Sequence, residues 1–244
     1  RIITWEARMV LRKYRPKIVA VTGNVGKTST KDALYAALRR AYFVRKSEKS
    51  YNSEIGVPLA ILDVPNAWMN PIGWVRNIAE GLRLIVLKNH YPKWLILEVG
   101  ADRPGDIGNI ASWLRPDIVV VTNIGEIPVH VEFFASADEM TEEKGKLVEA
   151  LNPNGLLVLD IDSPRAMSLA AKTKARVITY GFSAEAHFVA SHPEIIYGES
   201  NVPEGILFKV NHGARSVPVR ITGTVGMHHA YPVLAAIAVG VSEG

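Results

Sequence analysis

Residues 18–38, IVAVTGNVGKTSTKDALYAAL, contain the residue types that bind nucleotide phosphates. Glycines let backbone N–H groups approach phosphate oxygens, a lysine supplies positive charge, and a threonine hydroxyl can ligate Mg²⁺. The common phosphate-binding loop reads G-x-x-x-x-G-K-[ST]. Here Val21 stands at the first glycine position, and the loop has the shorter form T-G-x-x-G-K-T. A β-branched run precedes the loop and a helical pattern follows it, so this context favours phosphate binding over a structural turn.

Further candidate residues follow two other apolar runs. Glu98 ends the run WLILE, and Asn123 and His130 come after the run IVVV. In open α/β sheets, ligands bind at the carboxyl ends of the strands. A carboxylate and an imidazole near nucleotide phosphates could ligate a second divalent cation. Taken singly, Glu98 would be interpreted as a strand-end ion pair and His130 as a loop histidine bonded to backbone. Together with the phosphate loop, both are interpreted as site residues.

The elements that must position these residues form an alternating pattern. Continuous apolar runs, typical of strands buried on both faces of a parallel sheet, occupy residues 17–22, 94–100, 117–125 and 155–160. Helical patterns occupy residues 27–40, 105–114, 136–151 and 164–172. The segments 186–198, 204–213 and 214–223 indicate antiparallel strands, and residues 229–240 a closing helix. We predict an α/β fold: a mostly parallel sheet with flanking helices and a P-loop, plus a smaller antiparallel β subsheet towards the C-terminus.

Residues 72–88 form a strongly apolar helical pattern. They include Arg76, Glu80 and Arg83, and the stretch is too short and too charged for a membrane span. We expect a helix packed on the sheet, with an exposed hydrophobic patch as the alternative.

Composition restricts the class of protein. The chain has 244 residues and no cysteine, which excludes disulfides, thiol catalysis and cysteine-ligated metals and is typical of a cytoplasmic protein. Of 28 basic and 24 acidic residues, six basic and one acidic lie in residues 1–17, which leaves 22 basic and 23 acidic elsewhere. A nucleic-acid-binding surface spread over the protein is therefore not expected.

The N-terminal residues 1–16 predict a basic amphipathic helix or linker. Ile2, Trp5 and Met9 lie at helical spacing, and arginines mark another face. Such a helix can lie on an anionic membrane surface. The interpretation we favour is a helix packed on the domain with its arginines in solvent.

Four segments in order resemble the Mur ligases, the enzymes that add amino acids to the peptidoglycan precursor, and most of all their D-alanyl-D-alanine-adding type. They are TGNVGKTSTK at 22–31, NSEIGVPLAIL at 52–62, the long stretch at 97–136, and EEKGKL at 142–147. The match covers roughly residues 17–244. It implies a central ATP-binding domain at 17–244, with the family's precursor-binding and C-terminal ligase domains outside this chain.

The resemblance implies a role for each matching residue. Lys27 and the loop backbone would hold ATP phosphates, Thr28 and Glu98 would ligate Mg²⁺, and His130 would bind a second Mg²⁺. Lys144 matches a lysine that several members carry as a carbamate; the alternative is a solvated helix residue among acidic neighbours. The implied site residues are Lys27, Lys144 and His130 for catalysis, Thr22, Gly23, Asn24, Val25, Gly26, Lys27, Thr28, Ser29 and Asn52 for ATP, and Thr28, Glu98 and His130 for metal.

The implied reaction forms an amide bond. A substrate carboxylate attacks the γ-phosphate of ATP, and an amine displaces phosphate from the resulting acyl phosphate. The implied substrates are a UDP-MurNAc-peptide and D-alanyl-D-alanine, the implied location is the cytoplasm at the inner face of the membrane, with peripheral contact through residues 1–16, and no nucleic acid is involved. A folylpolyglutamate- or cyanophycin-type ligase and a non-catalytic nucleotide-binding module remain alternatives.

The chain departs from the family pattern at the nucleoside end. The family's G-x-H-N-x-x-N pattern appears as GMHHAYP, with His229 and Pro232 at the two asparagine positions. A further family asparagine appears as Asp160. The adenine contacts are therefore left open.

Overall fold

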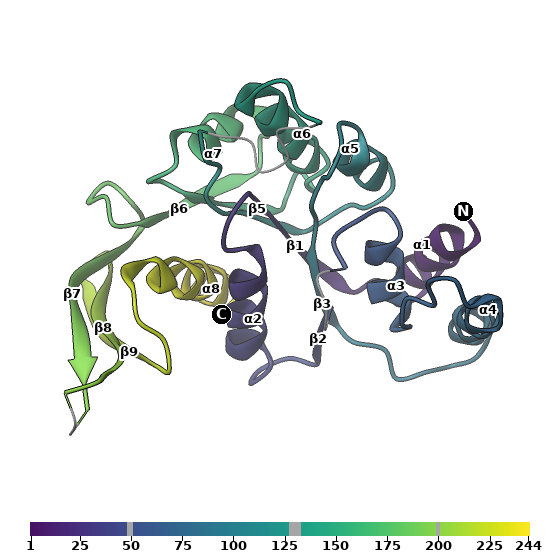
Figure 1. Ribbon diagram of the computed structural model, residues 1–244, viewed down its shortest axis with the longest axis horizontal. Coiled ribbons are helices and arrows are strands. Elements are labelled where there is room, and N and C mark those ends of the chain that lie inside the picture. Colours follow the sequence, from purple (N-terminus) through teal and green to yellow (C-terminus); the bar gives the residue numbers. More distant parts are fainter. Residues whose placement is uncertain (48–50, 127–132, 199–200) are drawn as a thin grey trace.

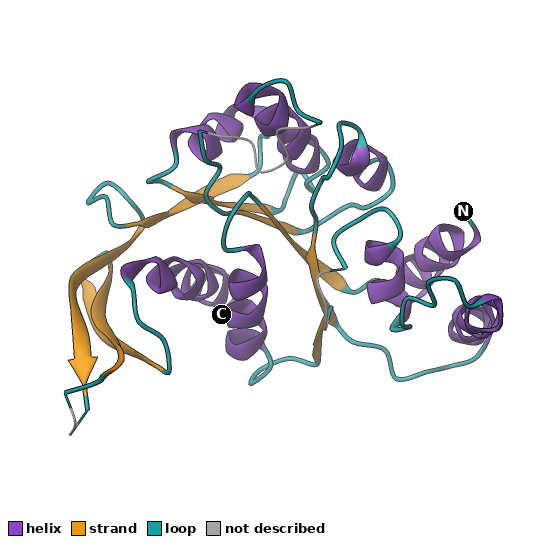
Figure 2. Cartoon of the chain, in the orientation of Figure 1, coloured by secondary structure: helices purple, strands orange, loops and turns teal. Residues whose placement is uncertain are grey.

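The computed structural model describes residues 1–47, 51–126, 133–198 and 201–244. One curved sheet runs through the molecule, and helices cover both of its faces (Figures 1 and 2). Its strands follow the order β2-β3-β1-β4-β5-β6-β7-β8-β9. The α/β class is confirmed, and the antiparallel strands extend the same sheet at its C-terminal edge.

The strands from β2 to β7 pair in parallel, and β7, β8 and β9 pair antiparallel. Since β1 lies between β3 and β4, the carboxyl ends of these three strands meet at one edge of the sheet. Their bounds are β1 Lys17–Thr22, β2 Val44–Lys46, β3 Trp94–Glu98, β4 Ile118–Val121, β5 Leu156–Asp160, β6 Arg176–Gly181, β7 Phe188–Tyr197, β8 Pro203–His212 and β9 Arg215–Thr222.

Alternate residues of the parallel strands enter two separate cores, because successive side chains point to opposite faces. Ile18 and Ala20 pack on the face covered by α1, α3, α5 and α6. Val19 and Val21 pack on the face covered by α2 and α8 (Figure 1). The helices are α1 Ile2–Tyr14, α2 Lys27–Leu38, α3 Gly56–Leu62, α4 Pro71–Val86, α5 Asp106–Ala111, α6 Ala137–Glu149, α7 Pro164–Ser168 and α8 Ala230–Glu243, with 3-10 turns η1 Leu169–Lys172 and η2 Met227–His229.

The predicted helix in residues 72–88 is present as α4, but its expected position on the sheet is wrong. Helix α4 packs mainly against α1 and also touches α3. Its inward face carries the buried Asn77 and Gly81 and the partly buried Trp74, Leu84 and Ile85, while a second set of apolar residues faces outward. The periodicity predicted the helix, but a second apolar face of α4 is left exposed, as the alternative interpretation expected.

Helix α1 agrees with the interpretation favoured from the sequence. Ala7 and Val10 are fully buried in the core, and Arg8, Arg12 and Arg15 are exposed. No helix in the described ranges is long and apolar enough to cross a bilayer.

Candidate nucleotide site

The loop between β1 and α2 has a backbone that favours glycine at two positions. Gly23 has φ 140°, and a Cβ there would lie 2.0 Å from Thr122 Oγ1. Gly26 has φ 88° and immediately precedes α2. No side chain caps the N-terminus of α2. The first N–H groups of α2 can therefore donate to an anion at the loop.

Lys27 opens α2 and folds back over the loop. Its Nζ donates to the carbonyl oxygens of Gly23 at 3.0 Å and Asn24 at 3.1 Å. Burial lowers the pKa of Lys27, although Glu98 and Asp102 act in the opposite direction. A partly desolvated cation over a glycine loop would be stabilised by phosphate charge.

The predicted metal residues Thr28 and Glu98 are in direct contact. Thr28 Oγ1 donates to Glu98 Oε2 at 2.9 Å, and Asn52 Nδ2 donates to Glu98 Oε1 at 3.3 Å. The Glu98 carboxylate ends β3, is 2% exposed, and lies 3.8 Å from Lys31 Nζ. A hydroxyl and a carboxylate are hard oxygen ligands suited to Mg²⁺.

The described part of the chain contains no cluster of three or more His, Cys, Asp or Glu side chains that could hold a metal by itself. His130 lies outside the described residues. Thr28 and Glu98 could supply two oxygen ligands, and phosphate oxygens and water would have to complete a Mg²⁺ shell, as is usual for this ion.

Lys144 reaches the same loop from α6. It is 3% exposed and shares a cavity of about 50 Å³ with Lys27, Asn24 and Asn52. Burial lowers the pKa of Lys144 to about 8, the charge of Lys27 adds to the effect, and Glu143 opposes it. Lys144 is therefore a buried amine beside the phosphate loop, and not the solvated residue that its acidic neighbours suggest.

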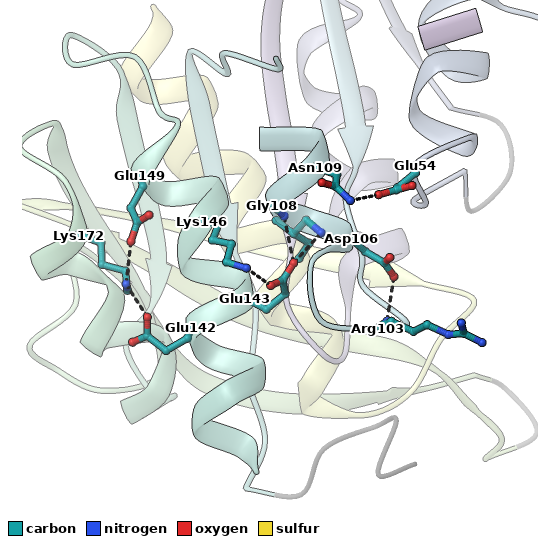
Figure 3. Close-up of polar contacts among 11 residues, drawn as sticks. Glu54, Arg103, Asp106, Gly108, Asn109, Glu142, Glu143, Lys146, Glu149 and Lys172 are labelled. Carbon is teal, nitrogen blue, oxygen red and sulfur yellow. Dashed lines mark hydrogen bonds and ion pairs between the residues drawn. The ribbon is translucent and has the colours of Figure 1, made fainter. Parts of the chain in front are cut away.

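Those acidic neighbours are engaged elsewhere. The buried Glu143 carboxylate accepts hydrogen bonds from the backbone N–H groups of Ile107 at 2.8 Å and Gly108 at 3.0 Å, and from Lys146 Nζ at 2.5 Å (Figure 3). Glu142 pairs with Lys172 at 2.8 Å. Glu143 thereby joins α6 to the first turn of α5. Sequence reasoning missed this role, because a glutamate among other charged residues on a helix carries no distinguishing signal.

Other predicted loop residues include buried polar atoms. Among the described residues, the Thr22 hydroxyl and both amide atoms of Asn24 are buried without a hydrogen-bond partner. Such atoms are uncommon in native proteins and often mark a ligand position, so they fit a nucleotide at this loop. Val25 is 67% exposed at the loop tip, and Ser29 is exposed on α2.

The three positions that depart from the family pattern lie in β5 and around the start of α8. Asp160 ends β5 at 3% exposure, and burial raises its pKa to about 7 although the Asp162 backbone donates to it. Pro232 is buried in α8. Burial and the neighbouring His228 lower the pKa of His229. No asparagine amide stands at these positions, so a purine would meet different groups here.

A parallel α/β sheet, a glycine loop opening into an uncapped helix, and a lysine, threonine and carboxylate around that loop define a P-loop nucleotide-binding protein. The chain belongs to the Mur ligase family: the profile of the Mur ligase middle domain matches residues 21–72 and 77–240. This confirms the resemblance predicted from the four segments.

Named relatives agree with this assignment. The UDP-N-acetylmuramoyl-tripeptide–D-alanyl-D-alanine ligase of Mycobacterium leprae is 28% identical over 233 residues, covering 93% of this chain and 40% of the ligase. MurF ligase from Thermotoga maritima, solved in complex with ADP, superposes with a TM-score of 0.77 at 24% identity, covering 100% of this chain and 49% of that one. A mutant of L. casei FPGS superposes with a TM-score of 0.64 at 13% identity, covering 99% and 61%. The chain spans less than half the length of the first two.

Proposed function

We propose that the protein containing this chain is an ATP-dependent ligase forming C–N bonds, which adds D-alanyl-D-alanine to a UDP-MurNAc-peptide in peptidoglycan precursor synthesis. This chain is its ATP-binding domain. The observation that carries the proposal is the convergence of Lys27, Thr28, Glu98 and Lys144 on one glycine loop. The 28% identity to a ligase of that name, over nearly the whole chain, supports the choice of substrates.

Each residue has a role in this reaction. The Lys27 amine and the N–H groups at the start of α2 bind the ATP phosphates. Thr28 and Glu98 would hold Mg²⁺, which neutralises charge on the β- and γ-phosphates when bound. Asn52 and Lys31 hold the Glu98 carboxylate in place. His130 is proposed for a second Mg²⁺ on the sequence pattern alone.

We further propose that Lys144 acts as a carbamate. The neutral amine attacks CO₂, a C–N bond forms, and a proton leaves to solvent. A pKa lowered to about 8 supports this step, because more of the amine is neutral near neutral pH. The resulting anion would lie beside Lys27 and could orient a cation or water.

Peripheral contact of residues 1–16 with the inner face of the membrane is part of the proposal. It is supported by the exposed Arg8, Arg12 and Arg15 of α1. A surface-bound basic helix would hold the ligase close to anionic lipid headgroups.

A folylpolyglutamate- or cyanophycin-type ligase is the alternative within the same chemistry, and a non-catalytic nucleotide-binding module is the alternative in another class. The departures from the family pattern at Asp160, His229 and Pro232 favour the non-catalytic nucleotide-binding module over a ligase. The intact contacts of Lys27, Thr28 and Glu98 favour a working site.

The test uses the full-length gene product with UDP-MurNAc-tripeptide, D-alanyl-D-alanine and Mg-ATP, and measures phosphate release and product mass. We expect amide formation, and a loss of roughly a hundredfold or more in kcat for Glu98→Gln, at a nearly unchanged melting temperature. Glu194→Gln, on the exposed surface of β7, is the matched control and should keep full turnover. Turnover with glutamate and a folate instead, or none with any acceptor, would contradict the proposal.

A further inference from the structure

Helix α4 presents a continuous apolar surface to solvent. Ile72, Val75, Ala79, Leu82 and Val86 are all exposed, and their spacing of three or four residues places them on one face of the helix. Ile72 is 79% exposed, Val75 67% and Val86 75%. These five residues are called the α4 stripe below. Side chains of this kind normally face the core, so their exposure needs a reason.

The orientation of α4 is fixed by polar contacts on its other side. Asn77 Nδ2 donates to Pro65 O at 2.7 Å, and a Cβ on Gly81 would lie 2.5 Å from the buried Glu6 carboxylate of α1. At the end of α4, Lys13 Nζ donates to the carbonyl oxygens of Leu84 at 2.7 Å and Ile85 at 2.9 Å. Since these contacts need the inward face of α4, the stripe cannot turn inward without breaking them.

The loop before α4 extends the apolar surface. Trp68 is 79% exposed and Met69 98% exposed. Trp68 has a left-handed backbone with φ 48°, its N–H donates to Asn66 Oδ1 at 2.9 Å, and its carbonyl accepts from Trp74 Nε1 at 2.8 Å. These bonds hold the loop in a conformation that leaves the Trp68 indole in solvent.

The charge around the α4 stripe is positive. Arg76 and Arg83 are exposed on α4 next to the stripe, and Lys88 follows the helix. On the neighbouring α1, Arg8 and Arg12 are exposed, whereas its only acid, Glu6, is buried. Glu80, the only acid of α4, pairs with Arg83 at 2.7 Å. The remainder of the chain has nearly balanced charge, so this surface is where the excess of basic residues lies.

We propose that the α4 stripe, with Trp68 and Met69, is a membrane-binding surface that lies in the headgroup layer of an anionic lipid bilayer. Helix α4 would lie in the plane of the interface, with a length of about 24 Å for its 16 residues. Its apolar residues enter the acyl boundary, and the flanking arginines bind lipid phosphates. A tryptophan beside the stripe suits the same layer, because indole rings favour the interface.

A lipid surface explains the charge better than a protein partner does. Two copies of this chain joined through the α4 stripe would bring Arg76 and Arg83 of both copies together, and that repulsion opposes a symmetric dimer. Arg76 on α4 and Arg8 and Arg12 on the neighbouring α1 are exposed cations, and the one acid of α4, Glu80, is paired with Arg83, which suits an anionic lipid surface. This proposal is independent of the ligase chemistry, and the two can fail separately.

The first experiment is flotation of the 244-residue chain with vesicles of phosphatidylglycerol and phosphatidylcholine, and with phosphatidylcholine alone. We expect binding only to the anionic vesicles, decreasing as salt is raised. Replacing Ile72, Val75 and Val86 together by glutamine should reduce partition roughly tenfold or more. Val241→Gln, at a valine that is 56% exposed on α8, is the control away from α4 and should bind like the wild type.

Charge is tested separately. Arg76→Gln should lower partition about fivefold, in line with about 1 kcal/mol for a basic residue near an anionic surface. Arg40→Gln, on an exposed arginine at the end of α2, should have little effect. If Arg76→Gln and Arg40→Gln lowered vesicle partition equally, net charge alone would explain the effect. That result would contradict the assignment of α4 as the membrane-binding surface.

Insertion is tested by tryptophan quenching with brominated lipids. Wild-type fluorescence should be quenched by anionic brominated vesicles, and Trp68→Phe should lose most of that quenching. Three outcomes would overturn the proposal: no binding to anionic vesicles at low salt, binding without quenching, or a stable dimer in solution that the stripe variant dissociates. The last would show that a second copy covers the stripe. In the full-length gene product, failure to bind vesicles together with slower hydrogen exchange of residues 72–86 than in the 244-residue chain would show that another domain covers the stripe.

Discussion

Lys144 is a buried amine that lines the same cavity as the Lys27 amine. Its pKa is lowered to about 8, first by burial and then by Lys27. The charged form is therefore disfavoured in the folded chain relative to the unfolded one. A residue that lowers stability beside a phosphate loop is typical of a functional site.

Replacing Lys144 by methionine should separate stability from activity. The folded pKa of about 8 lies below the ordinary value of 10.5, so the unfolded chain binds more protons and wild-type stability rises with pH across that window. Lys144→Met removes the buried charge, and it should raise the free energy of unfolding at pH 7 by up to about 3 kcal/mol. The gain should shrink as pH approaches 10.5, and denaturant unfolding in CO₂-free buffer measures it.

In the full-length gene product, the same Lys144→Met variant should lose ligase turnover, and bicarbonate should not restore it. Lys174→Met, at an exposed lysine preceding β6, is the control and should keep wild-type turnover. Wild-type turnover in Lys144→Met would exclude the carbamate role but leave the Thr28 and Glu98 argument intact, because that argument depends on different contacts.

Residues close together in sequence were predictable. Gly23, Gly26, Lys27 and Thr28 share one strand–loop–helix unit, and their positions follow from local chain geometry. The surroundings of Lys144 were not predictable, since they depend on where α6 packs against a loop more than a hundred residues earlier in the chain. The roles of His130 and Lys144 remain predictions.

At the scale of elements, α5 and α6 are joined through Glu143, the neighbour of Lys144 on α6 (Figure 3). Burial alone would raise the pKa of Glu143, but its bonds from Lys146 and Gly108 lower it on balance. The carboxylate thus stays ionised while it accepts two backbone N–H groups of α5 and the Lys146 ammonium.

Glu143→Ala and Glu142→Ala form a matched pair of adjacent substitutions. Glu143→Ala leaves buried donors unpaired and should cost about 3 kcal/mol of unfolding free energy. Glu142→Ala removes an exposed ion pair and should cost less than about 1 kcal/mol. Because the folded pKa of Glu143 is lowered, its contribution is present above the ordinary value of 4.5 and is lost as pH falls through the folded value. Equal losses of unfolding free energy for the two variants at neutral pH would contradict the role of Glu143 as the hydrogen-bond acceptor for the first turn of α5.

Glu6 gives the packing of α1 on α4 the opposite pH dependence. Its carboxylate is fully buried beside Gly81, neither oxygen has a hydrogen-bond partner among the described residues, and burial raises its pKa to about 7. The folded chain binds the extra proton, so this contribution is complete below 4.5 and is lost as pH rises through 7. Glu6→Gln should raise the melting temperature at pH 8 and change it little at pH 4.5. An equal change in melting temperature at pH 8 and pH 4.5 would show that the charge of Glu6 does not cause the effect.

Element positions were predictable where an apolar pattern and a buried face coincide, as in β1, β3, β4 and β5. They were not predictable for α4, which has apolar residues on more than one side and whose fully buried residues are Asn77 and Gly81. Helical periodicity specifies the faces of a helix but not which of them packs when polar contacts decide.

At the scale of the whole molecule, one sheet with a core on each face joins the phosphate loop of β1 to strands β7–β9 at its far edge. Two complete cores indicate a unit that folds independently. The chain nevertheless spans 40% of the M. leprae ligase and 49% of the T. maritima chain. We expect this unit to bind nucleotide. We expect ligation to require the longer protein.

The 244-residue chain should therefore bind Mg-ATP without forming amide bonds. The uncapped start of α2, the Lys27 amine and the Thr28–Glu98 pair are all within it, so isothermal titration should detect ATP binding that requires Mg²⁺. Lys27→Ala should weaken that binding at least tenfold, because it removes the only loop cation that contacts the glycine backbone among the described residues. Lys174→Ala, an exposed lysine preceding β6, should bind like the wild type. No binding at millimolar ATP would contradict the nucleotide site. Ligation of D-alanyl-D-alanine by these residues alone would instead contradict the domain interpretation, since the precursor would then need no other part of the protein.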